Sequence, residues 1–223
     1  MSSSVLRRKA LILRKQRKSY SQIKEILGVS KSTLSGWLRA YPLSREEINN
    51  LRARNDARIE RYRQTMQRKR EARYEGYLQE QKRLYLPLTR KELLVAGLFL
   101  YWGEGNKASR HAVSVNNTDP KFMQFVLYWM RYALKVPVQD IHVYVHLYAD
   151  MNVNKELNYW SRLLVVPLKQ FVKPYIKRSK RNEMDQKGYG HGTCGVYVGN
   201  TELKERILAS IQVIADYYMR KLH

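Results

Sequence analysis

The chain has 223 residues, and its 42 lysines and arginines against 19 aspartates and glutamates give it a formal net charge of +23 at pH 7. The repulsion among so many positive charges destabilises a folded chain. Such a charge is typical of proteins that bind a polyanion such as nucleic acid. No stretch reaches the ~18 consecutive apolar residues of a membrane span, and no signal-peptide core is present, so we expect a cytoplasmic, nucleoid-associated protein without a membrane partner.

Residues 1–43 have the pattern of a small helical domain. Ser21 and Ser30 stand where helix N-caps belong, and Gly28 between the two predicted helices allows a left-handed turn. With an earlier helix, the pattern resembles the helix-turn-helix of resolvases and bacterial regulators. An ordinary helical bundle with a solvated basic face is the alternative. The apolar core expected here consists of Val5, Leu11, Ile12, Leu13, Ile23, Ile26, Leu27, Leu34, Trp37 and Leu38.

The resemblance implies a role for the second of these helices. In helix-turn-helix proteins this helix enters the major groove, where its exposed side chains meet base edges and phosphates. The residues expected on that exposed side are Lys31, Ser32, Thr33, Ser35 and Arg39.

Residues 44–86 are rich in charged and amide side chains and poor in large apolar ones. The sparse apolar residues predict a long, mostly exposed helix, or a pair of helices, that links two domains. Its arginines suit a clamp along the DNA backbone, although a solvated linker helix explains the same composition. The basic residues in question are Arg52, Arg54, Arg58, Arg61, Arg63, Arg68, Lys69, Arg70 and Arg73.

Residues 87–223 alternate between helical and strand patterns. Thr89 and Glu92 form a capping-box pair before a very apolar helix that we expect to be buried nearly all round. The pattern predicts an α+β fold, with helices gathered on one face of an antiparallel sheet. The expected helices cover 93–102, 119–133, 154–164 and a final segment with Leu203, Ile207, Ile211, Ile214 and Tyr218, and the expected strands cover 112–116, 141–148, 171–177 and 193–199.

The outward face of this sheet is a second candidate for nucleic-acid contact. Cationic groups alternate there with flat aromatic ones, a combination that suits phosphates and sugars, although any sheet shows water a polar face. The outward residues expected from the alternation are Tyr144, His146, Tyr148, Lys173, Tyr175, Lys177, Thr193 and Tyr197. The glycine-containing loop that follows is expected to wrap a duplex, and it adds Arg178, Lys180, Arg181 and Lys187.

Residues 94–105 read LVAGLFLYWGEG and resemble the LAGLIDADG motif of homing endonucleases. Gly103, Glu104 and Gly105 match the acidic-glycine end of that motif, whereas Phe99 stands where the family keeps a small residue. The order of helices and strands is also similar to the saddle-shaped fold of the family. The whole chain resembles bacterial proteins that join a helix-turn-helix to such a domain.

The resemblance implies a metal-dependent endonuclease that acts on double-stranded DNA as a homodimer. Two motif helices would pack side by side, and Glu104 from each copy would hold Mg²⁺, which activates water and stabilises the leaving oxygen. Basic residues near the metal would steady the strained phosphate, and the candidates by position are Lys107 and Arg110, or else Lys173 and Lys177. The dimer seam would then contain Ala96, Gly97 and Leu100.

Other activities remain open at this stage. A regulator that keeps the fold and binds DNA without cleavage needs neither Glu104 nor metal, and a structural nucleoid or RNA-binding protein needs no sequence preference. His191 and Cys194 offer two zinc ligands without a further cysteine pair, so we expect a free thiol and no small-molecule cofactor.

Overall fold

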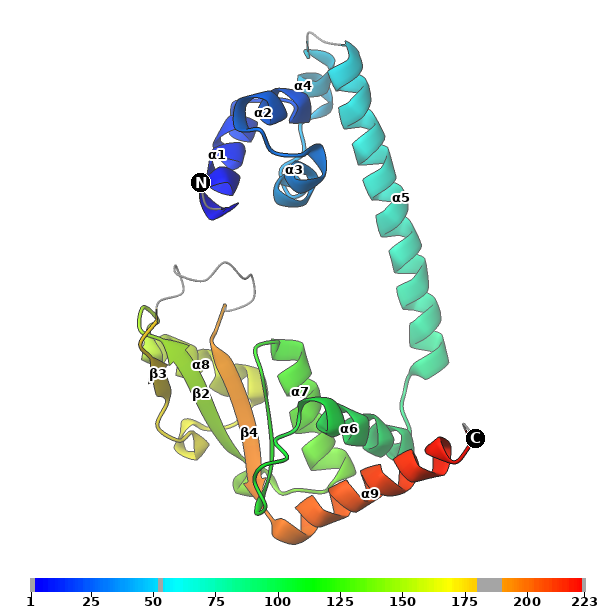
Figure 1. The fold of residues 1–223 in the computed structure, drawn as a ribbon, viewed down its shortest axis with the longest axis vertical. Coiled ribbons are helices and arrows are strands. Elements are labelled where there is room, and N and C mark those ends of the chain that lie inside the picture. Colours follow the sequence, from blue (N-terminus) through cyan, green and yellow to red (C-terminus); the bar gives the residue numbers. More distant parts are fainter. Residues whose placement is uncertain (1–2, 52–53, 180–189, 222–223) are drawn as a thin grey trace. The chain divides into compact units, whose positions relative to one another are not determined.

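The structure is a computed structural model that describes residues 3–51, 54–179 and 190–221. The chain divides into two compact units, unit 1 over Met1–Leu86 and unit 2 over Pro87–His223 (Figure 1). Among the described residues, no helix is both long and apolar enough to cross a membrane. Unit 1 is helical and contains α1 (Ser3–Lys15), α2 (Tyr20–Leu27), α3 (Lys31–Leu38), α4 (Arg45–Asn49) and α5 (Arg54–Tyr85).

The ends of α2 and α3 follow from local chemistry. Ser19, not Ser21 as expected, is the N-cap of α2, because its hydroxyl accepts from the Gln22 amide while the Gln22 side chain accepts from the Ser19 amide. Gly28 ends α2 in the left-handed conformation at φ 66°, as its position predicts. The side chain of Ser30 caps α3 by accepting from the Thr33 amide. The helix-turn-helix geometry is therefore encoded by side chains within the two helices and the turn.

The core of unit 1 differs from the sequence-based expectation. Val5, Ile12 and Ile26 are exposed, because α1 and α2 turn other faces towards α3. The pattern misses Ala10 and Tyr20, whose small or amphipathic side chains do not mark a stripe. The buried apolar cluster of α1, α2 and α3 contains Ala10, Tyr20, Ile23, Leu34 and Leu38.

The start of α5 belongs to the helix-turn-helix core and is not a free linker. Arg14 Nη1 and Nη2 donate to the two Glu60 carboxylate oxygens at 3.1 and 3.0 Å, and both side chains are almost fully buried. The Tyr20 amide donates to Glu60 at 3.0 Å, and Ser19 Oγ donates to Asp56 at 2.6 Å. From about Tyr62 onward α5 becomes mostly exposed, as its composition predicts.

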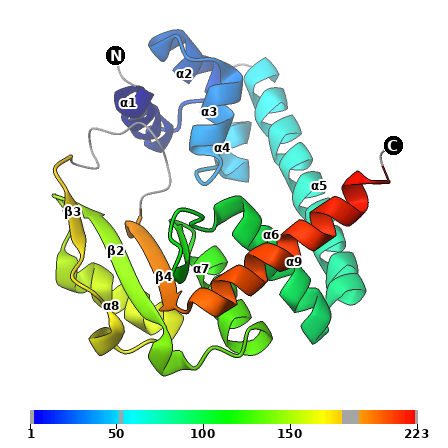
Figure 2. The ribbon, with the colours of Figure 1, turned by 60° about the horizontal axis from the view of Figure 1, so that its bottom comes forward.

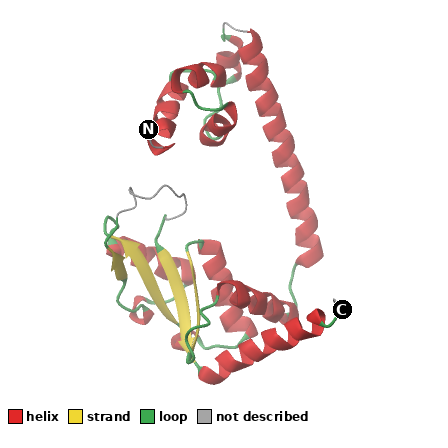
Figure 3. Ribbon diagram, in the orientation of Figure 1, coloured by secondary structure: helices red, strands yellow, loops and turns green. Residues whose placement is uncertain are grey.

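Unit 2 is an α+β fold built on a four-stranded sheet in the order β1-β4-β2-β3 (Figure 3). β4 pairs antiparallel with both β1 and β2, whereas β3 pairs parallel with β2, so the sheet is mixed and not antiparallel as expected. The reason is α8, which lies between β2 and β3 in the chain. It returns the chain to the end of the sheet where β2 began, so β3 runs in the same direction as β2. The elements are α6 (Arg90–Glu104), β1 (Ala112–Asn117), α7 (Pro120–Tyr128), the π-helical turn η1 (Trp129–Ala133), the 3₁₀ turn η2 (Val138–Asp140), β2 (His142–Tyr148), α8 (Val153–Leu164), the 3₁₀ turn η3 (Leu168–Gln170), β3 (Tyr175–Lys177), β4 (Thr193–Gly199) and α9 (Thr201–Met219).

One face of the sheet forms the core against the helices. The residues that point to it are fully buried, among them Val113, Val115, Val143, Val145, Cys194 and Val196. α7 packs on β1 and β4, and α9 lies alongside α6 (Figure 2). The core thus fixes which strand residues face outward, and that outward face carries the second candidate interface.

α6 is buried on one side only, in contrast to the expectation. Its N-terminal capping box of Thr89 and Glu92 is confirmed, and Leu93, Leu98 and Tyr101 face the core. Phe99 and Trp102 are exposed on the other side, with ring centroids 5.8 Å apart. An apolar composition therefore did not mean burial for this helix.

Candidate nucleic-acid interfaces

α3, the second helix of the expected helix-turn-helix, presents a narrow exposed face. Leu34 and Leu38 face the core, while Ser32, Thr33 and Arg39 are exposed, as the sequence predicts. Lys31 is half-buried at the helix start, where its carbonyl accepts from Arg63 Nη1 of α5 at 3.1 Å. α3 is thus held by its core on one side and by α5 on another.

Two of the expected contact residues lie towards α5. Ser35 is half-buried and its side chain is hydrogen-bonded to Tyr20, whose pKa is raised because burial disfavours the phenolate. Arg39 pairs with Glu71 of α5 at 3.5 Å, and both side chains are about half exposed. A cleft of about 150 Å³ between α3 and α5 is lined by both Ser35 and Arg39. Ser35 therefore belongs to the flank of the recognition helix, and Arg39 lies between that flank and the exposed face.

Gly36 occupies the centre of the exposed face and was not singled out from the sequence. Apart from its chain neighbours and the nearby backbone of α3 itself, no atom lies within 4 Å of the place where a Cβ would stand. A mid-helix glycine destabilises a helix by roughly 0.5–1 kcal/mol relative to alanine, and no contact within the described residues explains it. Because Gly36 has no side chain and lies beside Ser32 and Thr33, it would let the backbone of α3 approach a partner closely.

The outward face of the sheet in unit 2 carries a continuous layer of rings. The strand register places Ser114, Tyr197 and His142 in one row, and Asn116, Gly195 and Tyr144 in the next. Thr193, His146 and Tyr175 form the third row, and Tyr148 stands opposite Lys177. Ring centroids lie 5.2 Å apart for His142–Tyr197, 5.4 Å for Tyr144–His146 and 5.4 Å for His146–Tyr175.

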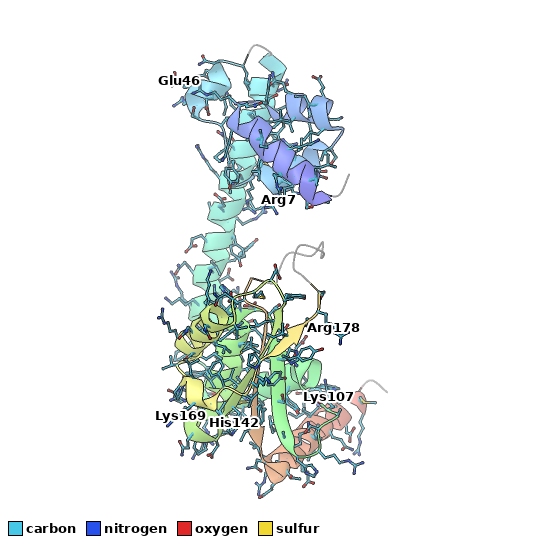
Figure 4. The ribbon with its side chains drawn as sticks, turned by 90° about the vertical axis from the view of Figure 1, so that its left-hand side faces the viewer. Arg7, Glu46, Lys107, His142, Lys169 and Arg178 are labelled. Carbon is cyan, nitrogen blue, oxygen red and sulfur yellow. The ribbon has the colours of Figure 1, made fainter. Side chains whose placement is uncertain are left out.

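The charge of this outward face is positive or neutral. No position in the paired rows is an aspartate or glutamate. Lys177 and its exposed neighbour Arg178 supply cations at the β3 edge, and Lys173 is exposed just before β3 and not within the strand as expected. Burial and the nearby Lys177 lower the pKa of His146, which favours the neutral imidazole. Figure 4 labels His142 at the start of β2 and Arg178 after the end of β3.

The structure corrects one further expectation for this face and does not describe the residues of another. Tyr148 is buried at 2% exposure, with the Lys177 ammonium 4.9 Å from its ring centroid, so it is not an outward contact residue. Lys180, Arg181 and Lys187 lie outside the described residues.

Glu104 is the last residue of α6 and is exposed. The chain then runs beside β1, because Gly105 bridges Val115 and the Asn106 amide donates to the Ser114 carbonyl at 2.9 Å. Lys107 is exposed, and its ammonium donates to the Gly103 carbonyl at 3.3 Å. Arg110 is also exposed. Glu104 and Lys107 therefore lie at the same edge of the sheet as Ser114.

A buried lysine that sequence reasoning missed holds the chain at this edge by hydrogen bonds. Lys204 of α9 is 2% exposed, and its ammonium donates to the Tyr101 hydroxyl and to the Asn106 carbonyl. Burial, and secondly the nearby Lys107, lower the pKa of Lys204. The apolar stripe expected for α9, with Leu203 and Ile207, does not include it.

A single chain does not fit a magnesium site at Glu104. Among the described residues, no group of three or more histidine, cysteine, aspartate or glutamate side chains is placed to hold a metal ion. Cys194 points into the core, where burial raises its thiol pKa, and His191 Nδ1 lies 2.6 Å from Glu156 Oε2. A LAGLIDADG-type Mg²⁺ site pairs two such carboxylates, so the second one would have to come from another copy of the chain.

The structure also differs from the expected dimer seam at one of its three residues. Gly97 is buried within unit 2, because a Cβ there would stand 2.0 Å from Nε1 of Trp129. Gly97 thus makes room for an indole of its own chain and is not available to a second copy. Ala96 is exposed and Leu100 half-buried, on the side of α6 that also carries Phe99 and Trp102.

Comparison with known proteins bears on unit 1. Residues 1–47 match the family model of a homeodomain-like domain, over α1 to α3 and into α4. No curated protein matches the chain. No solved structure matches it. The N-terminal segment of this protein is therefore a helix-turn-helix, similar to homeodomain-like domains.

Proposed function

We propose that this protein binds double-stranded DNA with sequence preference through α3 of its helix-turn-helix. The observation that carries the proposal is the exposed face of α3, where Ser32, Thr33 and Arg39 surround Gly36 on an otherwise packed helix. Hydroxyl and guanidinium groups read base edges and phosphates in the major groove, and a glycine brings the helix backbone close to them. The similarity to homeodomain-like domains and the net charge of +23 support the same partner.

α5 extends this surface beyond the helix-turn-helix. Its first turns are locked onto unit 1 through Glu60 and Arg63, so the helix leaves the core in a fixed direction. Exposed basic side chains follow along it, and each is suited to phosphates, which add affinity without sequence information. The exposed basic residues concerned are Arg58, Arg61, Arg68, Lys69, Arg70 and Arg73.

Of the two activities expected from the sequence, we favour binding without cleavage, as in a transcription regulator. Cleavage by a LAGLIDADG-type centre would require Mg²⁺ and a homodimer, because such a centre pairs one carboxylate from each of two motif helices and this chain has one such helix, which ends at Glu104. The observation in favour of the nuclease is the position of Glu104 beside Lys107. That pair would place an acid and a cation together at a DNA phosphate only if a second copy completed the site.

The experiment is selection of bound DNA from a randomised duplex library with the full chain. We expect a defined sequence motif whose preference changes with Thr33→Ala, by about 1–3 kcal/mol at one base position. Arg39→Ala should weaken binding, and Arg206→Ala should not, although it removes the same charge from an exposed site on α9. Equal recovery of all sequences by the unmodified chain would contradict sequence preference.

The same selection tests the nuclease when Mg²⁺ is added and cut ends are sequenced. Binding without cut ends supports the regulator. Cut ends at a defined sequence that disappear with Glu104→Gln would establish the endonuclease and overturn our preference.

A further inference from the structure

Tyr144 lies flat on the outward face of the sheet in unit 2. A Cβ on Gly195 of β4 would stand 2.1 Å from Cζ and 2.5 Å from Oη of Tyr144, so the phenol ring fills the place of the missing side chain. Its hydroxyl reaches side chains of β1, where Asn116 Nδ2 donates to it at 3.1 Å and Ser114 Oγ is hydrogen-bonded to it at 3.3 Å. The side chain therefore spans from β2 over β4 to β1. A side chain that covers the neighbouring strand in this way must lean along the sheet, with one ring face towards Gly195 and one face outward.

The ring is fixed in this orientation and has ring-bearing neighbours. The bonds from Ser114 and Asn116 hold the hydroxyl, and Gly195 offers no side chain that would lift the ring. His142 and Tyr197 stack on each other at one side, with 28° between their planes. His146 and Tyr175 continue the layer at the other side, and Tyr175 is 61% exposed.

We propose that this aromatic sheet face binds single-stranded DNA by stacking bases on Tyr144 and on the rings beside it. Unstacked bases pair their flat faces with aromatic rings, while cations beside the platform hold the phosphates. Lys177 and Arg178 at the β3 edge provide those cations, and the paired rows contain no carboxylate to repel the strand. Duplex binding by α3 is not needed for this activity. Only the choice of DNA over RNA rests on it.

A duplex does not fit the same geometry. Its bases are stacked on each other, and a protein reads them by their edges in the grooves. Tyr144 shows a ring face and not a hydroxyl, because the hydroxyl is occupied by Ser114 and Asn116. The neutral state that burial favours for His146 also suits stacking better than groove contact.

The test measures binding of the full chain to a fluorescent thymidine oligonucleotide about 12 nucleotides long, a length within the range that single-strand-binding sites cover. Tyr144→Leu should weaken binding about 5- to 150-fold, the effect of losing one stacked base. Tyr144→Phe keeps the ring but loses both hydrogen bonds, so its loss should be smaller. Tyr217→Leu is the matched control, because it removes an exposed tyrosine from α9 and should change nothing.

Competition experiments separate this proposal from the function of α3. Arg39→Ala should weaken duplex binding and leave single-strand binding unchanged, whereas Tyr144→Leu should do the reverse. The proposal is overturned if Tyr144→Leu binds the oligonucleotide as the unmodified chain does, or if a duplex or an RNA of equal length competes as well as the single-stranded DNA. Circular dichroism of each variant shows whether it folds. If Tyr144→Leu does not fold, binding of the oligonucleotide by Tyr144→Phe is the deciding measurement.

Discussion

Replacing Glu60 by glutamine should unlock α5 from the helix-turn-helix. Glu60 accepts three hydrogen bonds, two from Arg14 and one from the Tyr20 amide, and its side chain is 2% exposed. The variant keeps the size of the side chain but leaves the Arg14 guanidinium buried without a counter-charge. The remaining acceptors of Arg14, the carbonyls of Lys18 and Tyr41, are neutral.

The expected loss can be worked out from this burial. Breaking a buried ion pair from one side costs about 3–5 kcal/mol. Unit 1, at Met1–Leu86, is expected to have a stability of about 4–13 kcal/mol at the usual 0.05–0.15 kcal/mol per residue. The substitution should therefore remove about a quarter or more of the stability of unit 1 and leave unit 2 unchanged.

Hydrogen exchange of the full chain, followed by mass spectrometry, reads the two units separately. Amides of α1 to α3 should exchange about 140- to 3,700-fold faster in Glu60→Gln, which is 3–5 kcal/mol converted at 1.4 kcal/mol per factor of ten. Glu71→Gln is the matched control, since it removes an exposed carboxylate from the same helix and should leave exchange unchanged. Protection of α1 to α3 that stays within a few-fold of the unmodified chain in Glu60→Gln would refute the idea of a lock.

Three further changes test other parts of the structure. Gly97→Ala should destabilise unit 2 by about 1–3 kcal/mol in urea unfolding, because its Cβ meets the Trp129 indole, whereas Gly103→Ala in the same helix meets nothing within 4 Å and should not. Gly36→Ala should slightly stabilise unit 1, by about 0.5–1 kcal/mol, and weaken duplex binding, and equal or tighter binding would argue against close approach. The lowered pKa of Lys204 means that the folded state binds fewer protons, so stability should rise with pH below the ordinary value of 10.5, and urea unfolding at pH 7 and 9.5 should show this rise lost in Lys204→Met.

Local signals in the sequence predicted the parts of the fold that local chemistry decides. The turn at Gly28, the cap at Ser30 and the capping box of Thr89 with Glu92 depend on residues only a few positions apart, and all are confirmed. The cap of α2 was placed two residues late, because Ser19 and Ser21 carry the same side chain. Only the Gln22 side chain, three residues after Ser19, separates them.

Features that depend on distant partners escaped the sequence. Glu60 and Arg14 read as surface charges until the fold brings them together across 46 positions. Lys204 reads as a solvated lysine until its ammonium meets Tyr101 and Asn106. The parallel pairing of β3 had a signal in the sequence, since a helix between two strands is the usual connection of a parallel pair. The prediction of an antiparallel sheet followed instead from the alternation of apolar and polar residues in the strands.

The candidate site residues divide in the same way. Exposure of Ser32, Thr33 and Arg39 follows from helical periodicity, and the outward direction of Tyr144 follows from strand alternation. How Tyr144 lies cannot follow from alternation, because it depends on the absence of a side chain at Gly195 on another strand.

Two glycines show how structure separates packing from function. At Gly195 the Tyr144 ring occupies the place of a side chain, so the glycine is explained by packing within unit 2. Gly36 lacks one with open space around it, and its helical conformation gains nothing from glycine. A local cost without an internal benefit is expected at functional sites. Close approach of DNA to the backbone of α3, as proposed above, would supply that benefit, and the Gly36→Ala variant tests it.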